Sequence, residues 1–362
     1  MNGFRQPSTP VVLLTCGDPA GIGPEVVAKA WAATPAHART RLRVVADPDV
    51  LAAAVAGRRG LPPLPHVVVA IDDPRASRPD ELLVVAPDDS APRAGADDSP
   101  LAARGRAAAT AVLAAAAVVR AGRAVAVVTG PLHKEALHAA GYDAPGHTEL
   151  LARACGLPDD AASMMLWLPA ADGGPGGLGV VHATLHEPLR AALARLTTPG
   201  IVAAGLRLDP LLAALLGRRP RIAVAALNPH GGEGGLFGDE EPRLVGPAVE
   251  SLRAAGIDAT GPLPADTLFL RAARGEFDGV VALYHDQGHI PIKLLGMHRA
   301  VNITLGLPLV RTSVAHGTAL DIAGTGAADP ASMLAAIDAA VRLVAAGWPR
   351  AAAAPSSPRP AA

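Results

Sequence analysis

The sequence contains few aromatic residues, which account for 2% of its 362 positions, and only two cysteines, Cys16 and Cys155. The cysteines have neither the CxxC spacing of a redox motif nor the density of a disulfide scaffold, which favours a reducing compartment. The formal net charge of -1 provides no attraction to nucleic acid or to an anionic membrane. No run reaches the about 18 apolar residues that a membrane span needs, and the N-terminus lacks the pattern of a signal peptide. We therefore expect a cytoplasmic protein that binds neither nucleic acid nor a membrane.

Short β-branched runs alternate with Ala/Leu-rich stretches, a pattern typical of an α/β protein with a largely buried sheet. The predicted strands are VVLLT (11–15), AVAVVTG (124–130), GVVHAT (179–184), RIAVAAL (221–227), GVVALY (279–284) and VNITLG (301–306). The predicted helices span residues 24–34, 100–121, 147–154, 187–197, 241–255 and 329–346. Residues 71–99, rich in Asp and Pro, are expected to form an irregular surface excursion. Residues 348–362 are expected to be a disordered tail.

Polar clusters follow the predicted strands, each where a strand has just ended. These clusters are TCGDPAGIGPE, TGPLHKEAL, LHEPLR, LNPHGGEGGLFGDEE, YHDQGHIPIK and LGLPLVRTS. In an open α/β sheet the ligand binds beyond the carboxyl ends of the strands, so we expect these loops to converge. The pattern indicates an enzyme.

Three histidines, His186, His230 and His285, each lie just past a predicted strand. Neutral imidazole is a common metal ligand, and three protein ligands with open positions are typical of a catalytic metal site. A single histidine in such a loop more often forms a capping hydrogen bond. Three in equivalent places favour a metal site.

Two further patterns concern anions. The stretch GDPAGIGPE precedes a helix and fits either an anion site or a tight helix entry, whereas GGPGGLG leads into a strand and is rejected as a dinucleotide fingerprint. A phosphate monoester is well bound by an ammonium, a neutral hydrogen-bond donor and a guanidinium that can donate two parallel hydrogen bonds. These groups are present in Lys293, Asn302 and Arg311. Arg311 lies between apolar residues, where an unpaired charge is costly.

Several blocks together resemble the 4-hydroxythreonine-4-phosphate dehydrogenase family, in the same order from about residue 11 to 346. They are GDPAGIGPE, GHTELLA, LNPHGGEGG, GPLPADTLF, YHDQG and VNITLGLPLVRTSVAHGTALDIAG. The resemblance implies an isocitrate/isopropylmalate dehydrogenase-like fold, in which residues 1–347 form two α/β lobes around a central cleft. It also implies a homodimer with sites at the subunit interface, NAD or NADP as cofactor, and a divalent metal (Zn, Mg, Co or Mn).

The resemblance assigns the metal to His186, His230 and His285, and the substrate to His147, Thr148, Lys293, Asn302 and Arg311. The stretch HATLHEPL contains two histidines, so His182 is an alternative to His186 as the metal ligand. We favour His186 because it directly precedes the helix-like EPLRAAL. The stretch YHDQGHIPIKLLG, which contains His289, is more similar to relatives that act on 4-phospho-threonate or 4-phospho-erythronate.

The implied reaction is oxidation, with decarboxylation, of a phosphorylated 3-hydroxy acid of the 4-phosphooxy-L-threonine type. The alternative substrates are 4-phospho-D-threonate and 4-phospho-D-erythronate, and we expect His289 to face the C2 substituent and to favour these sugar acids. Lys134 and Asp286 are the candidate bases, and Asp286 also suits the role of orienting an imidazole. Alternatives of other classes are a non-catalytic phosphate-ligand binding protein and a metal-dependent acyl or phosphoryl transferase.

Overall fold

The computed structural model of the chain describes residues 9–56, 64–87, 99–171 and 176–349. Its centre is one 12-stranded sheet with the order β3-β4-β2-β1-β5-β12-β11-β6-β7-β10-β8-β9. The strands are β1 (Val11–Thr15), β2 (Arg41–Val45), β3 (His66–Val68), β4 (Leu82–Val85), β5 (Ala126–Thr129), β6 (Ser163–Pro169), β7 (Gly177–His182), β8 (Ile222–Ala225), β9 (Ala259–Leu263), β10 (Gly279–Ala282), β11 (Val301–Leu305) and β12 (Val310–Val314).

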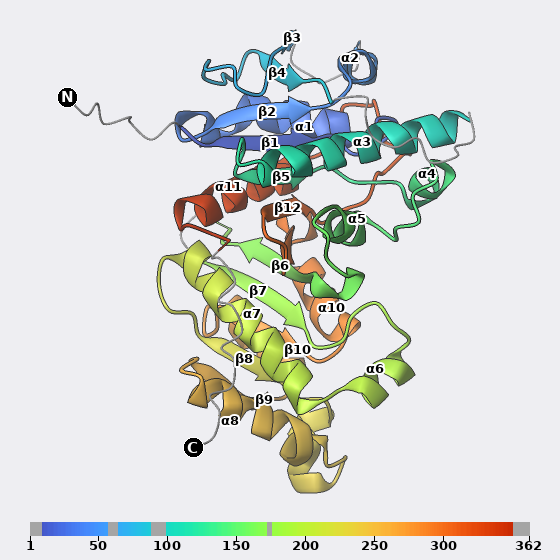
Figure 1. Cartoon of the computed structure of the whole chain (residues 1–362). Helices are drawn as coiled ribbons and strands as arrows, with labels where there is room; N and C mark the ends of the chain where they lie inside the picture. The colour runs from blue at the N-terminus through green and yellow to red at the C-terminus, as the bar shows by residue number, and fades with distance from the viewer. Residues whose placement is uncertain (1–8, 57–63, 88–98, 172–175, 350–362) are drawn as a thin grey trace, which may run out of the picture.

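Helices cover both faces of the sheet (Figure 1). On one face α11 contacts both α1 and α7. Helices α3, α5 and α10 cover the other face. The helices are α1 (Gly23–Ala33), α2 (Pro48–Val55), α3 (Pro100–Arg120), α4 (Lys134–Ala139), α5 (His147–Ala154), α6 (Leu189–Arg195), α7 (Thr198–Leu216), α8 (Gly246–Ala254), α9 (Ala265–Ala273), α10 (His285–Gly296) and α11 (Ala331–Ala345).

The strand directions divide the sheet into two halves. From β3 to β12 all neighbours are parallel, whereas β11 is antiparallel to both β12 and β6, and β6 is antiparallel to β7. Strands β7, β10, β8 and β9 are again parallel to one another. Strands β1 and β5 therefore run opposite to β7, β8, β10 and β11, and the expectation that all six polar loops share one sheet edge is wrong.

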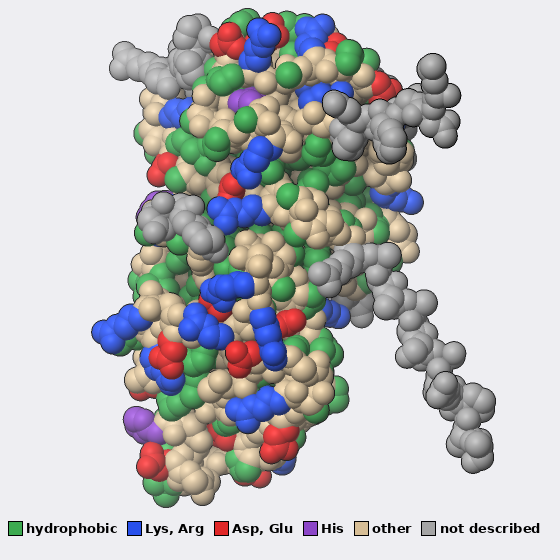
Figure 2. All heavy atoms as spheres, turned by 90° about the vertical axis from the view of Figure 1, so that its left-hand side faces the viewer, with side chains coloured by type: hydrophobic (Ala, Val, Ile, Leu, Met, Phe, Trp, Pro, Cys, Tyr) green, Lys and Arg blue, Asp and Glu red, His purple; other side chains and the backbone are tan. Residues whose placement is uncertain are grey.

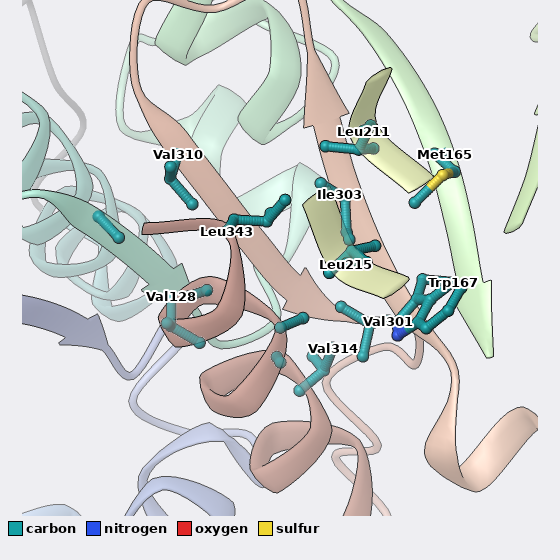
Figure 3. Packing of buried hydrophobic residues seen from close by; sticks show 14 of the residues in the cluster. Val128, Met165, Trp167, Leu211, Leu215, Val301, Ile303, Val310, Val314 and Leu343 are labelled. Carbon is teal, nitrogen blue, oxygen red and sulfur yellow. The ribbon is translucent and has the colours of Figure 1, made fainter. Parts of the chain in front are cut away.

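The middle strands pack their core side against α7 and α11 (Figure 3). Val301 and Ile303 of β11 lie beside Met165 and Trp167 of β6, and Leu211 of α7 packs against them. Since neighbouring residues of a strand point to opposite faces, Asn302 and Thr304 are turned to the other side. Because one set of alternating side chains of β6 and β11 is buried in this core, the other set, which includes Asn302 and Thr304, points to the opposite face of the sheet.

All six predicted strands and the six predicted helical regions are confirmed, although residues 241–255 divide into a π-helical turn, Glu241–Val245, and α8. The irregular excursion predicted for 71–99 is wrong in part, because β4 pairs there with β2 and β3. Residues 88–98 and 350–362, including most of the predicted tail, lie outside the described residues. The loop expected at YHDQGH is the first turn of α10. The extent of the two-lobed unit, 1–347, stays a prediction, and its strands form one continuous sheet.

Two helices, α3 and α7, are long and apolar enough to cross a membrane by length and composition, and 44% of the relevant window of each is buried. Helix α3 packs on β1 and β5, and α7 packs on β7 and β10, as core helices do. Figure 2 shows acidic and basic side chains interspersed on one face of the molecule. That face presents no field of a single sign.

Candidate substrate cleft and imidazole cluster

A cleft of about 250 Å³ lies on the face of β6, β11 and β12 that is turned away from the core. The loop after β5 and helices α5 and α10 border it. All five predicted substrate-binding residues line it, together with one of the candidate bases and the histidine expected to face C2: His147, Thr148, Lys293, Asn302, Arg311, Lys134 and His289. The structure therefore brings together residues that are far apart in sequence.

Strand register explains why the polar residues of the middle strands meet. Asn302 pairs with Ser313 on β12 and with Leu166 on β6, and Thr304 pairs with Arg311 on β12. Because paired residues point to the same face of a sheet, these side chains lie on one face, where all but Thr304 line the cleft and Thr304 accepts from Arg311. The site lies on the face of the antiparallel middle strands and extends to the loops that follow β5 and β12.

Arg311 is a buried cation, with 2% of its surface exposed. Its Nε and Nη2 donate to Oγ1 of Thr129 at 3.2 and 2.7 Å, and its Nη1 donates to Oγ1 of Thr304 at 3.0 Å. Burial lowers the pKa of Arg311 to about 9, opposed by the field of Glu149, and the guanidinium remains charged at neutral pH. Among the described residues no carboxylate lies within ion-pair distance of it. A buried guanidinium held by neutral hydroxyls beside a cleft is suited to bind an anion.

The N-terminus of α5 adds to this anion site. Its N-cap, Gly146, has no side chain to cap the first backbone N–H groups, and His147 and Thr148 form the first turn at the edge of the cleft. Backbone N–H groups at such a terminus favour an anion. Burial and the nearby charge of Arg311 hold the pKa of His147 well below its ordinary value, so this imidazole is neutral. Its Nε2 is buried without a hydrogen-bond partner among the described residues, as is Oδ1 of Asn302.

Two of the three predicted metal ligands lie together beside this cleft. The rings of His186 and His285 are 5.6 Å apart and line a smaller cavity of about 220 Å³ with Asp286. Nδ1 of His285 donates to Oδ1 of Asp286 at 2.7 Å, which leaves Nε2 free. A ligating histidine that donates its other N–H to a carboxylate is the usual arrangement at metal sites. Asp286 therefore has the contact expected of a group that orients His285.

His230 lies apart from that pair. It follows β8 in the segment Pro229–Gly235, in which residues 230–234 all have positive φ, with φ 53° at His230, and this segment packs against β9 and α9. Within the described part of one chain, no group of three metal-ligating side chains is arranged to hold an ion. The three-histidine metal site stays a prediction, with His186 and His285 brought together and His230 separate.

His182 lies under α10 rather than in the cavity of His186. Its Nε2 is 3.1 Å from Nδ1 of His289, and its ring is 4.6 Å from that of His289. His289 in turn stacks on His285 with ring centroids 3.7 Å apart. Burial and neighbouring imidazoles lower the pKa of His182 to about 3 and that of His289 to about 4, so both are neutral at pH 7.

The stretch GDPAGIGPE has a packing role. A Cβ on Gly23 would lie 1.8 Å from the carbonyl oxygen of Cys16, so only glycine permits this helix entry. The buried Asp18 accepts from Nε and Nη2 of Arg104 at 3.0 and 2.6 Å, which joins the loop to α3. Of the two interpretations left open by the sequence, the tight helix entry accounts for these contacts.

Several residues of the site were not selected from the sequence. Thr129 ends β5 and Thr304 lies in β11; both are buried and hold Arg311 without lining the cleft. In β11 the alternation of Asn302 and Thr304 with apolar residues was the available pattern. His316 lines the cleft, with its Nδ1 hydrogen-bonded to the carbonyl oxygen of Gly317 at 2.9 Å and its Nε2 buried without a described partner. Its place in the block VAHGTAL was the only sequence feature pointing to it.

The sheet, the buried arginine and the adjoining imidazoles define an α/β protein with a cleft whose lining suits an anion. A family model described as "Pyridoxal phosphate biosynthetic protein PdxA" matches residues 38–340. A 4-hydroxythreonine-4-phosphate dehydrogenase of Beijerinckia indica is 46% identical over 91% of this chain and 94% of its own length. A D-threonate 4-phosphate dehydrogenase of Cupriavidus necator is also 46% identical, over 91% of this chain and 95% of its own.

Among solved structures, the 4-hydroxythreonine-4-phosphate dehydrogenase of Klebsiella pneumoniae superimposes with a TM-score of 0.76 at 41% identity, covering 92% of this chain and 98% of that one. The chain belongs to the PdxA family. The predicted resemblance and α/β fold are thereby confirmed, and the family is one of dehydrogenases, which makes this chain an oxidoreductase.

Proposed function

We propose that the protein oxidises the C3 hydroxyl of a 4-phosphorylated 3-hydroxy acid with NAD or NADP, and that the resulting 3-keto acid loses carbon dioxide. The observation that carries this proposal is Arg311, a buried cation without a described carboxylate partner, facing a cleft beside paired imidazoles. The names of the curated relatives support the same substrate type.

The phosphate of the substrate binds at the end of the cleft that holds Arg311. The hydroxyls of Thr129 and Thr304 leave one N–H on each terminal nitrogen of the guanidinium free for phosphate oxygens. Lys293 adds a point charge, and the uncapped N-terminus of α5 adds backbone donors. This end of the cleft recognises a dianion.

The reacting carbon lies toward His186 and His285. These imidazoles fit a divalent metal, because Asp286 holds Nδ1 of His285 and leaves Nε2 free. A bound divalent ion would polarise the C3 hydroxyl and stabilise negative charge on its oxygen. Lys134 lines the cleft, and its charge adds to the effects of burial and of His285, which lower the pKa of His186.

The reaction balances as follows. The C3–H bond breaks and its electron pair leaves as hydride to the nicotinamide, while a base takes up the hydroxyl proton; the candidates are the carboxylate of Asp286 and Lys134 in its neutral amine form. The C1–C2 bond of the 3-keto acid then breaks, carbon dioxide leaves, and C2 takes up a proton. Asp286 keeps the imidazole of His285 oriented through both steps.

A homodimer with sites at the subunit interface is part of the proposal. Ile290, Leu294 and Met297 recur at helical spacing along α10 and its C-terminus, with 54%, 82% and 46% of their surfaces exposed. Leu236 and Phe237, just after His230, are also exposed. An exposed apolar face beside an incomplete site favours burial by a second copy. We propose that His230 of the partner subunit completes the site of His186 and His285, in a cytoplasmic dimer.

Mixing two inactive variants tests this arrangement. His230→Ala and His285→Ala homodimers should each lack metal and activity, but a hybrid of the two retains one intact site. We expect activity and bound metal to return after dissociation and reassembly of the mixture. A mixture that stays inactive while forming hybrid dimers would contradict the shared site.

A substrate panel watched at the absorbance of NADH tests the activity. Reduction of NAD or NADP by a 4-phosphorylated hydroxy acid, and not by its dephosphorylated form, supports the proposal. Tight binding of the compound without reduction would instead favour the non-catalytic binding protein. Activity that a chelator abolishes, without nicotinamide reduction, would favour the transferase.

A further inference from the structure

His182 and His289 form a pair of imidazoles directly behind the cleft. Nδ1 of His289 lies 3.1 Å from Nε2 of His182 and 3.2 Å from the backbone carbonyl oxygen of His285. His182 ends β7, and His289 lies one turn into α10. Only His289 of the pair lines the cleft, so His182 can act on a ligand only through it.

The partners of His289 determine where its proton lies. A backbone carbonyl oxygen can only accept, so Nδ1 of His289 carries a hydrogen and donates. Nε2 of His182 lies 3.1 Å from the same nitrogen and must then be an acceptor. In the neutral ring, Nε2 of His289 is therefore a lone-pair acceptor. Within the described part of the chain that atom makes no hydrogen bond, and it is not among the buried atoms that lack one.

Glycine at position 288 is what allows the pair to form. A Cβ there would lie 2.4 Å from Nε2 of His182 and 2.7 Å from Cγ1 of Val180. The first turn of α10 thus packs directly on β7, with the ring of His182 filling the space beside Gly288. The contact restricts the ring of His182 to one position.

The cleft that His289 lines contains positive but no negative side chains among the described residues, which affects the charge of the substrate group that can bind there. Lys134, Lys293 and Arg311 all line it, and the described lining contains neither Asp nor Glu. The carboxylate of Glu149 influences Arg311 but is not part of the lining. An ammonium on the substrate would meet like charges there, whereas a hydroxyl would not.

We propose that His182 is a positioning residue that, together with the carbonyl oxygen of His285, holds the ring and the tautomer of His289, so that Nε2 of His289 accepts a hydrogen bond from a hydroxyl on C2 of the substrate. This inference rests on the proposed function and selects, within it, phosphorylated 2,3-dihydroxy acids over the corresponding 2-amino acid. The pair acts on the group beside the reacting carbon and not on the phosphate.

Two compounds that differ only at C2 test the pair: D-threonate 4-phosphate, with a hydroxyl, and 4-hydroxythreonine 4-phosphate, with an ammonium. Their dissociation constants are measured by titration calorimetry without nicotinamide, and their specificity constants with it. The variants are His182→Leu, which removes the acceptor, His182→Gln, whose amide oxygen reaches the position of Nε2, and His289→Leu. His37→Leu is the matched control, since His37 is another hydrogen-bonded imidazole, with Ser77 and Trp31 as its partners, and does not line the cleft.

We expect the wild-type protein to prefer the hydroxy acid. His182→Leu and His289→Leu should each reduce the ratio of the two dissociation constants by roughly threefold to tenfold, the effect expected from the loss of about one hydrogen bond. In His182→Leu the change should fall on KM more than on kcat. His182→Gln should retain the wild-type ratio, and His37→Leu should lower the melting temperature without changing the ratio.

Three results would overturn the inference: a wild-type preference for the amino acid, a ratio that His182→Leu leaves unchanged, or an equal loss in His182→Gln and His182→Leu. Because binding is measured without turnover, the experiment can contradict the proposed activity without contradicting the role of the His182–His289 pair, and the reverse. Binding with the expected ratios but without nicotinamide reduction contradicts the proposed activity alone. Turnover with an unchanged ratio in the variants contradicts the role of the pair alone.

Discussion

Replacing Arg311 by lysine keeps a positive charge but removes the planar fork. Lysine cannot reproduce the bonds that Nε and Nη2 make to Thr129 together with the bond from Nη1 to Thr304. A hydrogen bond to a charged group contributes about 1.5 to 3 kcal/mol, so loss of one such bond to phosphate weakens binding roughly tenfold to 150-fold. We expect Arg311→Lys to raise the KM for the phosphorylated substrate by that factor, with a smaller effect on kcat.

The control for this variant is another buried arginine. Arg43 has 0% of its surface exposed and donates to backbone carbonyl oxygens of Leu42, Asp73 and Arg75, away from the cleft. Arg43→Lys should lower the melting temperature and leave KM unchanged. Steady-state kinetics and thermal unfolding of both variants separate lost recognition from lost packing. An unchanged KM in Arg311→Lys, in a protein that melts normally, would remove Arg311 from the phosphate site.

Three further predictions concern stability and metal. Burial raises the pKa of Asp278, but hydrogen bonds from Arg218 and Arg221 outweigh this and lower it to about 2. The ionised carboxylate of Asp278 therefore stabilises the fold above pH 3.8, its ordinary pKa, and this stabilisation is lost as the pH falls toward 2. At pH 7, Asp278→Asn should reduce the free energy of unfolding, measured with denaturant, by up to about 2 kcal/mol. The difference between the variant and the wild-type protein should narrow below pH 4. Gly288→Ala should destabilise the fold by about 1 to 3 kcal/mol through its clash with His182, and a normal melting temperature would contradict that packing. His230→Ala should remain folded and lose metal, and stoichiometric metal in the variant would remove His230 from the ligands.

The strands that could be predicted from the sequence are those with β-branched runs. VVLLT and VNITL are recognisable because Val, Ile and Thr favour a pleated surface. Strand β6, SMMLWLP, has no such composition and forms because β11 and β7 pair with it on either side. Helix α10 was missed because Gly288 and Pro291 disfavour a helix locally, while its packing on β7 and β10 stabilises one.

The cleft residues could be predicted individually, but their arrangement could not. Lys293, Asn302 and Arg311 were selected for their chemistry, and the structure brings them together. The polar loops were expected to converge beyond the strand ends, but Asn302 and Arg311 lie within β11 and β12, and their meeting depends on the antiparallel pairing of β11 with β12 and β6. Thr129 and His182 contribute only through long-range contacts, to Arg311 and His289 respectively, which no local pattern encodes.

The central claim is tested most directly by the purified protein, NAD or NADP and a divalent metal, with D-threonate 4-phosphate and 4-hydroxythreonine 4-phosphate as substrates and their dephosphorylated forms as controls. The measurement is the absorbance of the reduced nicotinamide together with the carbon dioxide released. We expect reduction and equimolar carbon dioxide with a phosphorylated compound, and little of either without the phosphate. Equal rates with and without the phosphate, or no reduction with any phosphorylated hydroxy acid, would contradict it.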